Sequence, residues 1–238
     1  MEHEITEHAR KLYLASMNPR KKAWSKAKEI FFEILIIVFS VSLAVYLERL
    51  REEGHEQKAV KEFLSGLKVD LQNDINEMNS DKKSYIGTGQ AFAYITSVKP
   101  GAILNKDTIR RYSNYLLNST GLISNSGRYE GFKSSGKIIN IENKELQNNI
   151  LDLYQEDIPS LLASTNSYTK RKEILWQFMI DNMKLDKDGN GNMAEILNTD
   201  KGKIICRNLL YTGEILDRYD TVIIKSQRII SLIDTDFK

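Results

Sequence analysis

Oxygen-bearing side chains alternate with other residues between positions 186 and 192, as they do in a calcium-binding loop. Asp186, Asp188 and Asn190 have the spacing of the first three ligands of an EF-hand loop, and Gly191 follows where that loop turns. A hard cation such as Ca²⁺ prefers oxygen ligands of this kind. The candidate ligands are Asp186, Asp188, Asn190, Asn192 and Glu195.

The far end of this segment departs from the calcium-loop pattern. Leu197 stands where an EF-hand has its bidentate glutamate, and Glu195 comes two residues too early. Asp, Asn and Gly also dominate ordinary turns, so a polar linker between two helices explains the same residues. We therefore expect weak calcium binding at most and no other cofactor.

A further ionisable residue, Glu33, lies in a strongly apolar segment. Of the 18 residues from Ile30 to Leu47, 13 are Ile, Leu, Val or Phe. A helix of this length spans about 27 Å, close to the roughly 30 Å of a bilayer core. The apolar residues favour insertion by about 6 kcal/mol, whereas a charge at mid-bilayer costs only about 2.5–3.5 kcal/mol. The segment is predicted to be a transmembrane helix.

Two other interpretations of this segment are weaker. An interfacial helix needs a wide polar face, which the segment lacks. A signal peptide is suggested by Ser42-Leu43-Ala44, which resembles a cleavage site after an apolar core. The preceding region is long and begins with three glutamates, which favours an uncleaved span.

Glu33 shares one face of the predicted span with two small residues, Ser40 and Ala44. The small pair has the spacing that lets two membrane helices approach closely. Glu33 is therefore interpreted in three ways: it reaches the headgroups from one turn inside, it lines a helix–helix interface, or it handles protons or cations. The candidate transmembrane packing and ionisable residues are Glu33, Ser40 and Ala44.

Charge and composition exclude several classes of function. Residues 1–28 hold seven of the 34 Lys and Arg and three of the 32 Asp and Glu, which leaves 27 basic and 29 acidic side chains elsewhere. A part so close to neutral lacks the basic face of a nucleic-acid binder. Cys206 is the only cysteine, so no intrachain disulfide forms. No constellation of acid, base and nucleophile is visible, and the chain is not expected to be an enzyme.

The remaining chain carries helical patterns throughout, and an all-α fold is predicted. The expected organisation is a basic juxtamembrane segment at 1–29, a transmembrane helix at 30–47 that continues into the following chain, and a helical-bundle domain at 48–238. After a pause near Gly54, apolar residues from Val60 to Met78 recur at steps of four and three, which indicates core packing or a short coiled coil, with Asp70, Asp74 and Glu77 on a solvated face.

Further helices are predicted along this domain. One covers about 85–95 with a stop at Lys99-Pro100-Gly101, and the next opens at Asn105 and closes at Gly121. A third begins near Asn143, its cap, and runs on past Pro159, which should kink or restart it. The last two cover 170–183 and 201–233. A Gly/Ser-rich middle lies between Gly127 and Gly136, and residues 136–141 are expected to be a short extended piece.

The order of these parts resembles a family of proteins. The basic segment is followed by EIFFEILIIV at 29–38, and much later by YEGFKSSGKIINIENKEL at 129–146 and ILDLY at 150–154. This pattern is similar to a family of uncharacterised single-pass bacterial membrane proteins, known as a domain of unknown function. The resemblance implies a membrane anchor and a helical domain, and it implies no catalytic or ligand-binding residue.

The sequence thus leads to a membrane-anchored helical interaction or assembly protein. The expected partners are the lipid bilayer and either further copies of the chain or another membrane protein. The expected location is the bacterial cytoplasmic (inner) membrane, with the N-terminus in the cytoplasm, because five Lys and Arg precede the span and four follow it closely. The alternatives are an ion-coupled or channel-like component that uses Glu33, and a weak calcium-responsive sensor.

Overall fold

The computed structural model describes residues 22–99 and 102–236, and these residues form helices joined by short loops. Among them no strand forms, and a single isolated β-bridge pairs Leu185 with Gly191. The predicted all-α class is therefore confirmed. The chain divides between Glu56 and Gln57 into two units, which are described separately.

Helix α2 (Lys22–Ser97) contributes residues to both units. The pause expected near Gly54 is wrong, because the helix continues through this residue. A glycine inside a helix costs only about 0.5–1 kcal/mol relative to alanine, which its neighbours readily offset. The segment 85–95, expected to be a separate helix, also belongs to α2. The helix ends at Ser97, before the predicted stop, of which Pro100 and Gly101 lie outside the described residues.

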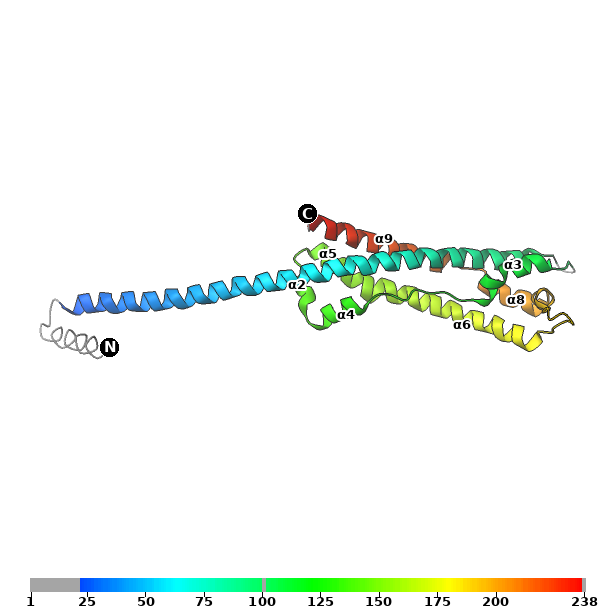
Figure 1. Cartoon of the computed structure of the whole chain (residues 1–238), viewed down its shortest axis with the longest axis horizontal. Coiled ribbons are helices and arrows are strands. Elements are labelled where there is room, and N and C mark those ends of the chain that lie inside the picture. The colour runs from blue at the N-terminus through cyan, green and yellow to red at the C-terminus, as the bar shows by residue number, and fades with distance from the viewer. Residues whose placement is uncertain (1–21, 100–101, 237–238) are drawn as a thin grey trace. The chain divides into compact units, whose positions relative to one another are not determined.

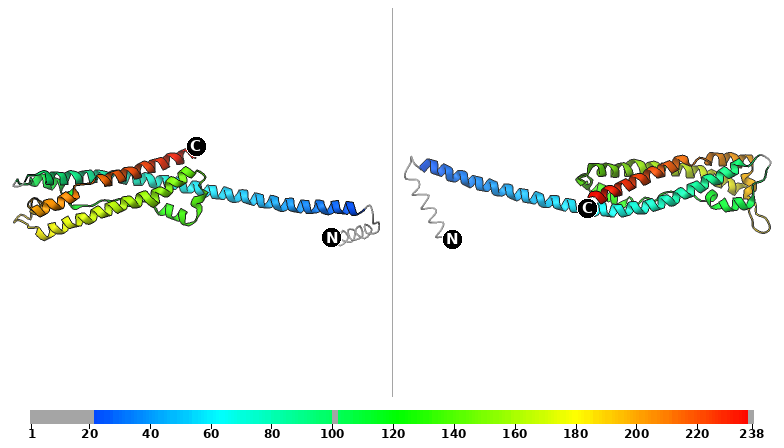
Figure 2. Two further views of the ribbon diagram at one scale, coloured as in Figure 1. Left: turned by 180° about the vertical axis from the view of Figure 1, so that it is seen from behind. Right: turned by 90° about the horizontal axis from the view of Figure 1, so that it is seen from above.

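The second unit is a bundle in which the later part of α2 lies along α6 (Ile158–Asn182) and α9 (Gly213–Asp236), as Figures 1 and 2 show from three sides. On α2, the stripe predicted from the spacing is buried: Leu67, Leu71 and Met78 have no exposed surface. Because these side chains are separated by about one and two helical turns, they share one face of the helix, and that face lies in the core.

Polar side chains also connect α2 to α9. Lys68 forms an ion pair with Asp234, and Lys82 forms one with Asp220. The Tyr219 hydroxyl donates a hydrogen bond to the carboxylate of Asp81 over 2.9 Å, and both residues are buried. The two helices are thus joined at several points along their length.

Two shorter helices begin at the caps that the sequence predicts. Helix α3 (Lys106–Leu117) starts after Asn105, whose Oδ1 accepts a hydrogen bond from the backbone N–H of Thr108 at 2.9 Å. Helix α5 (Lys144–Asp152) starts after Asn143, whose Oδ1 accepts one from Leu146 at 3.0 Å. Each asparagine satisfies a backbone donor that the first helical turn leaves free.

The Gly/Ser-rich middle is more regular than its composition indicates. It forms α4 (Gly127–Ser134) and a 3₁₀ turn, η1 (Lys137–Asn140), so the expected extended piece at 136–141 is wrong. Gly136 joins the two with a φ of 74°, a left-handed conformation that glycine adopts without strain. The Tyr129 ring stacks on Tyr154 at 4.2 Å between centroids, and this packing holds α4 against the core.

A five-residue π-helix, η2 (Leu153–Asp157), joins α5 to α6. The helix returns to α geometry at Ile158, with Pro159 in its first turn, so the chain stays helical past this proline and the irregular turn lies just before it. The wider turn lets the consecutive residues Leu153 and Tyr154 both face the core.

The last predicted helix is divided in two. Helix α8 (Asp200–Leu209) follows the short α7 (Met193–Leu197), and α9 begins at Gly213. At the break, the carbonyl of Thr212 accepts hydrogen bonds from Ile215 and Leu216, both at 3.1 Å, and so opens α9.

The connection between α3 and α4 lies along α2 and is held there by four carboxylates one turn apart, Asp70, Asp74, Glu77 and Asp81, which we call the acidic ladder. We call residues 118–126 the strap. The ladder binds the strap and Arg128 in antiparallel order: Thr120 donates to Asp81, the Ile123 N–H to Glu77, Ser124 and Asn125 to Asp74, and Arg128 to Asp70. The expected solvated face is therefore wrong for Asp74, which is 1% exposed.

Candidate functional site

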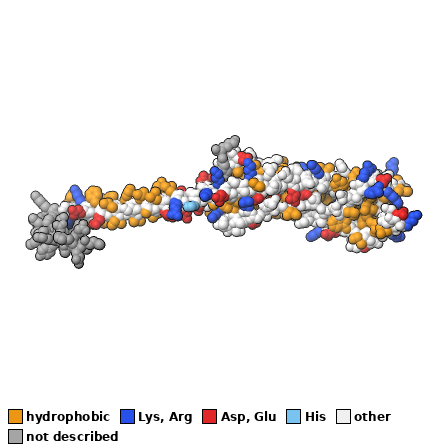
Figure 3. All heavy atoms as spheres, viewed as in Figure 1, with side chains coloured by type: hydrophobic (Ala, Val, Ile, Leu, Met, Phe, Trp, Pro, Cys, Tyr) orange, Lys and Arg blue, Asp and Glu red, His pale blue; other side chains and the backbone are white. Residues whose placement is uncertain are grey.

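The described part of the first unit is dominated by exposed apolar side chains. Between Ile30 and Leu47 every Ile, Leu, Val and Phe is 44–64% exposed, and no described residue packs against this surface. Figure 3 shows these side chains as an apolar band, with charged side chains gathered beyond it. Among the described helices, α2 alone has a segment apolar and long enough to cross a membrane.

The candidate transmembrane residues Glu33, Ser40 and Ala44 all lie in this band, and all three are exposed. Seven and four residues separate them in one uninterrupted helix, so they share a face as expected. No described side chain contacts that face, and its role in helix packing stays a prediction.

The calcium-loop candidates lie in the turn between α6 and α7. Asp186 Oδ1 accepts hydrogen bonds from the backbone N–H groups of Asp188 and Asn190, both at 2.9 Å, and the bond from Asn190 lowers the pKa of Asp186. Asn192 Oδ1 accepts one from Lys184 at 2.7 Å, while Glu195 pairs with Lys106 at 3.2 Å.

These bonds engage the side chains of Asp186 and Asn192 within the turn and pair Glu195 with Lys106 of α3, and Asp188 takes part through its backbone N–H. Within the described ranges no three acidic, histidine or cysteine side chains come together as metal ligands do. The polar linker considered from the sequence accounts for the bonds of the turn. Calcium binding stays an untested prediction.

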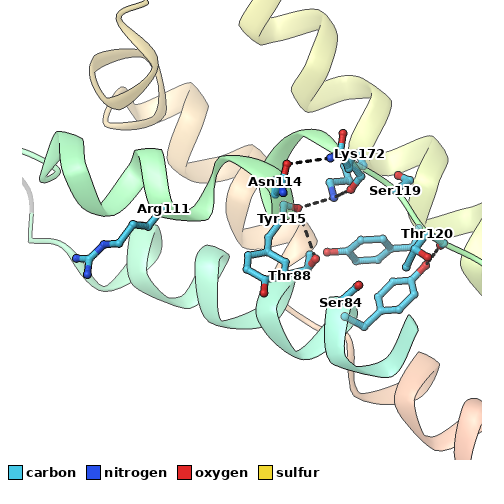
Figure 4. Close-up of a pocket in the computed structure, with 11 residues that line it drawn as sticks. Ser84, Thr88, Arg111, Asn114, Tyr115, Ser119, Thr120 and Lys172 are labelled. Atoms are coloured by element: carbon cyan, nitrogen blue, oxygen red, sulfur yellow. Dashed lines mark hydrogen bonds between the residues drawn. The ribbon is translucent and has the colours of Figure 1, made fainter. Parts of the chain in front are cut away.

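A cavity of about 410 Å³ opens between α2, α3, the strap and α6. We call it the Lys172 cavity, after the one lysine among its lining residues, several of which Figure 4 labels. The lining consists of Ser84, Tyr85, Thr88, Arg111, Asn114, Tyr115, Asn118, Ser119, Thr120, Tyr168 and Lys172.

Lys172 is 2% exposed, although it carries an ammonium group. The ammonium donates hydrogen bonds to the carbonyl oxygens of Tyr115, at 2.6 Å, and of Asn118. One turn further along α6, the indole N–H of Trp176 donates to the carbonyl of Leu116 at 3.4 Å. These carbonyls belong to the end of α3 and the residue after it, where a helix leaves acceptors free and carries partial negative charge.

The partial charge of a helix end compensates a full positive charge only in part. Consistent with this, burial lowers the pKa of Lys172 from 10.5 to about 8. Among the described residues, no carboxylate pairs with this ammonium within 4.0 Å.

Two tyrosines form an apolar wall of the cavity. The rings of Tyr85 and Tyr168 meet edge to face, with 5.6 Å between their centroids. The Tyr85 hydroxyl donates to the carbonyl of Thr120 at 2.9 Å, and the Tyr168 hydroxyl donates to that of Leu209 at 2.7 Å. Burial raises the pKa of both phenols, so both stay neutral and fix the wall in place.

Lys172 was not among the functional residues predicted from the sequence. The signal was present, because Tyr168, Lys172, Leu175 and Met179 recur at helical spacing and all are buried. A lysine among three apolar residues of one stripe marks a buried cation. The carbonyls that receive it come from another helix, and their position is not readable from local pattern.

Comparison of the chain with protein-family models, with curated proteins and with solved structures found no match in any of the three. The resemblance to single-pass bacterial membrane proteins of unknown function therefore stays a prediction.

Proposed function

We propose that this chain is a membrane-anchored interaction protein, in which residues 30–47 cross a bilayer and the helical bundle meets other proteins. The observation that carries the proposal is the exposure of every Ile, Leu, Val and Phe between Ile30 and Leu47. Water is a poor solvent for so long an apolar surface, which a soluble helix buries on at least one side. The same surface suits hydrocarbon, and a helix leaves no backbone group unpaired there.

The test of the anchor is extraction of full-length protein from membranes. We expect the chain to stay with vesicles after an alkaline carbonate wash and to float with them in a density gradient. Replacing Ile37 and Val38 together by arginine should release a large share of it, because each charge near mid-bilayer costs about 2.5–3.5 kcal/mol. Ile224→Arg is the matched control, since Ile224 is equally exposed but belongs to the bundle.

Two results would contradict the anchor. Wild-type protein that leaves the vesicles in the wash would show that residues 30–47 do not hold it in lipid. Mature protein that begins just after Ala44 would identify the segment as a cleaved signal peptide.

We further propose that the span assembles with another span through the face of Glu33, Ser40 and Ala44. Small residues let two helices come close, and a carboxylate in such an interface is shielded from lipid. Ala44→Leu should reduce crosslinked dimers in detergent, whereas Ser42→Leu should not, because Ser42 lies on the opposite face. A protein that stays monomeric in detergent, with neither substitution changing the amount of crosslinked dimer, would refute assembly through this face.

The proposed location is the bacterial cytoplasmic membrane, with the N-terminus inside. The support is the small excess of Lys and Arg before the span, part of which lies outside the described residues. Reporter fusions at both termini test the orientation. An active cytoplasmic reporter at the C-terminus would reverse it.

A further inference from the structure

We propose that the Lys172 cavity binds a small anion, whose phosphate or carboxylate group accepts a hydrogen bond from the Lys172 ammonium. The inference concerns the bundle alone and does not depend on how the chain meets a membrane. It rests on the hydrogen bonds of Lys172, on the charges of the lining, and on the size of the cavity.

Among the described residues, the hydrogen bonds of Lys172 leave one of its donors without an acceptor. A lysine ammonium has three N–H groups, and two of them point to the carbonyls of Tyr115 and Asn118. One acceptor lies in the last turn of α3 and the other on the residue after it, so they hold the ammonium beside the end of α3, and Lys172 is one of the residues that line the cavity. A buried N–H without an acceptor is costly, and an anion in the cavity supplies that acceptor.

The charges of the lining favour an anion over a cation or a neutral ligand. The eleven lining residues include two basic side chains, Lys172 and Arg111, and no acidic one. Arg111 lies at the edge of the cavity, and Figure 4 shows its guanidinium pointing away from Lys172. Asp81 lies behind the lining, and its carboxylate is occupied by the hydroxyl groups of Thr120 and Tyr219.

The size and surface of the cavity suit a small organic molecule. Its volume of about 410 Å³ falls within the range of about 300–1,000 Å³ that ligand pockets occupy. The edge-to-face rings of Tyr85 and Tyr168 offer an apolar wall to a carbon skeleton. Ser119 is exposed and lies on the strap side of the cavity, and its hydroxyl bonds no other described side chain, so it can bond a ligand oxygen.

The fluorescence of Trp176 reports on the cavity, because this residue lies one turn from Lys172 on the same helix. The chain has only two tryptophans, so Trp24→Phe leaves Trp176 as the single fluorophore. We would titrate full-length protein in nonionic detergent with inorganic phosphate, succinate and uncharged glycerol, at constant ionic strength. A saturable change with phosphate or with succinate is expected at millimolar concentration or below, and the one that binds identifies the anionic group.

Variants of the lining separate binding from folding. Ser119→Ala should weaken binding about two- to tenfold, the value of one neutral hydrogen bond, and Arg111→Gln about two- to fivefold. Arg110→Gln is the matched control, because Arg110 is the neighbouring exposed arginine and does not line this cavity. Lys172→Met should abolish binding with the helical circular-dichroism spectrum retained.

Several results would contradict anion binding in the Lys172 cavity. The proposal is overturned if neither anion gives a saturable change, or if glycerol gives the same change. It is also overturned if Ser119→Ala and Arg111→Gln bind the anion as tightly as Arg110→Gln does. The serine and arginine variants keep the proposal falsifiable should the lysine variant fail to fold, because both side chains are exposed.

Discussion

The attachment of the strap to Asp74 gives the sharpest test of the structure. This carboxylate accepts hydrogen bonds from Ser124 Oγ at 3.2 Å, from the Asn125 backbone N–H at 3.1 Å and from Asn125 Nδ2 at 2.6 Å. Burial raises the pKa of Asp74, since desolvation outweighs these bonds. Asp74→Asn and Asp74→Ala both remove the charge, and they differ in what remains for the strap.

The asparagine variant should keep all three contacts. Its amide oxygen accepts from both nitrogens of Asn125, and its amide nitrogen donates to Ser124, whose hydroxyl accepts as well as donates. The alanine variant loses all three bonds, each worth about 0.5–1.5 kcal/mol. We therefore expect Asp74→Asn to exceed Asp74→Ala in free energy of unfolding by about 3 kcal/mol.

The assay is denaturant unfolding of the full-length chain in detergent, followed by circular dichroism. Hydrogen exchange of a peptide that covers the strap adds a local measurement. A loss of 3 kcal/mol corresponds to about a hundredfold faster exchange of the Asn125 amide when exchange follows opening of the strap. Asp107→Ala is the control, because Asp107 is exposed and its ion pair among the described residues is with Arg110 in its own helix.

A comparison of the stability of wild type with that of Asp74→Asn measures the effect of the Asp74 charge alone. A raised pKa means that the folded chain takes up a proton more readily than the unfolded chain, so the stability contributed by Asp74 is present below pH 3.8 and is lost as pH rises through the folded pKa. The free energy of unfolding of Asp74→Asn should therefore increase relative to that of wild type as pH rises. Equal stability of the asparagine and alanine variants would refute the attachment of the strap through Asp74.

Three further outcomes are expected. In thermal unfolding, Gly202→Ala should destabilise the bundle by about 1–3 kcal/mol, because the added Cβ would lie 2.4 Å from the backbone oxygen of Ile196. Gly131→Ala should instead stabilise the bundle by about 0.5–1 kcal/mol, because its added Cβ would meet no atom within 4 Å. Between pH 8 and 10.5 the unfolded chain holds a proton that folded Lys172 has released, so the free energy of unfolding should rise with pH by as much as about 3 kcal/mol, and Lys172→Met should abolish this rise. Cys206 has no exposed surface and burial raises its pKa to about 12, so iodoacetamide should alkylate it only as the bundle unfolds.

Each of these outcomes has a clear opposite. Equal stability of the two alanine variants would mean that α8 does not pack on α7 as closely as described. A pH dependence that survives Lys172→Met would assign the titration to another group. Rapid alkylation under native conditions would place Cys206 outside the core.

The parts of the fold that were predictable depend on local pattern. The all-α class follows from apolar residues at helical spacing, and Asn105 and Asn143 mark helix starts because a cap is formed by neighbours along the chain. Gly54 misled because a single glycine is a weak helix breaker when its neighbours favour the helix. In the middle segment, burial of Tyr129 outweighs the cost of the glycines.

The candidate site was less predictable because its parts are distant in sequence. Lys172 lies 57 and 54 residues from its two carbonyl partners, so its burial depends on how α3 and α6 pack. Asp74 was expected in solvent because it alternates with exposed charges, but its donors come from the strap, about fifty residues later. A carboxylate with a distant partner and one in water look alike in the sequence.

The pairing of α2 with α9 has a consequence for the speed of folding. Lys68 and Asp234 are 166 residues apart, and Tyr219 is 138 residues from Asp81. Closing so large a loop costs conformational entropy before either contact forms, and proteins dominated by such contacts fold more slowly than helical bundles built from neighbouring hairpins. Until the two helices meet, the apolar stripe of α2 is exposed to solvent and can associate with apolar surfaces of other chains.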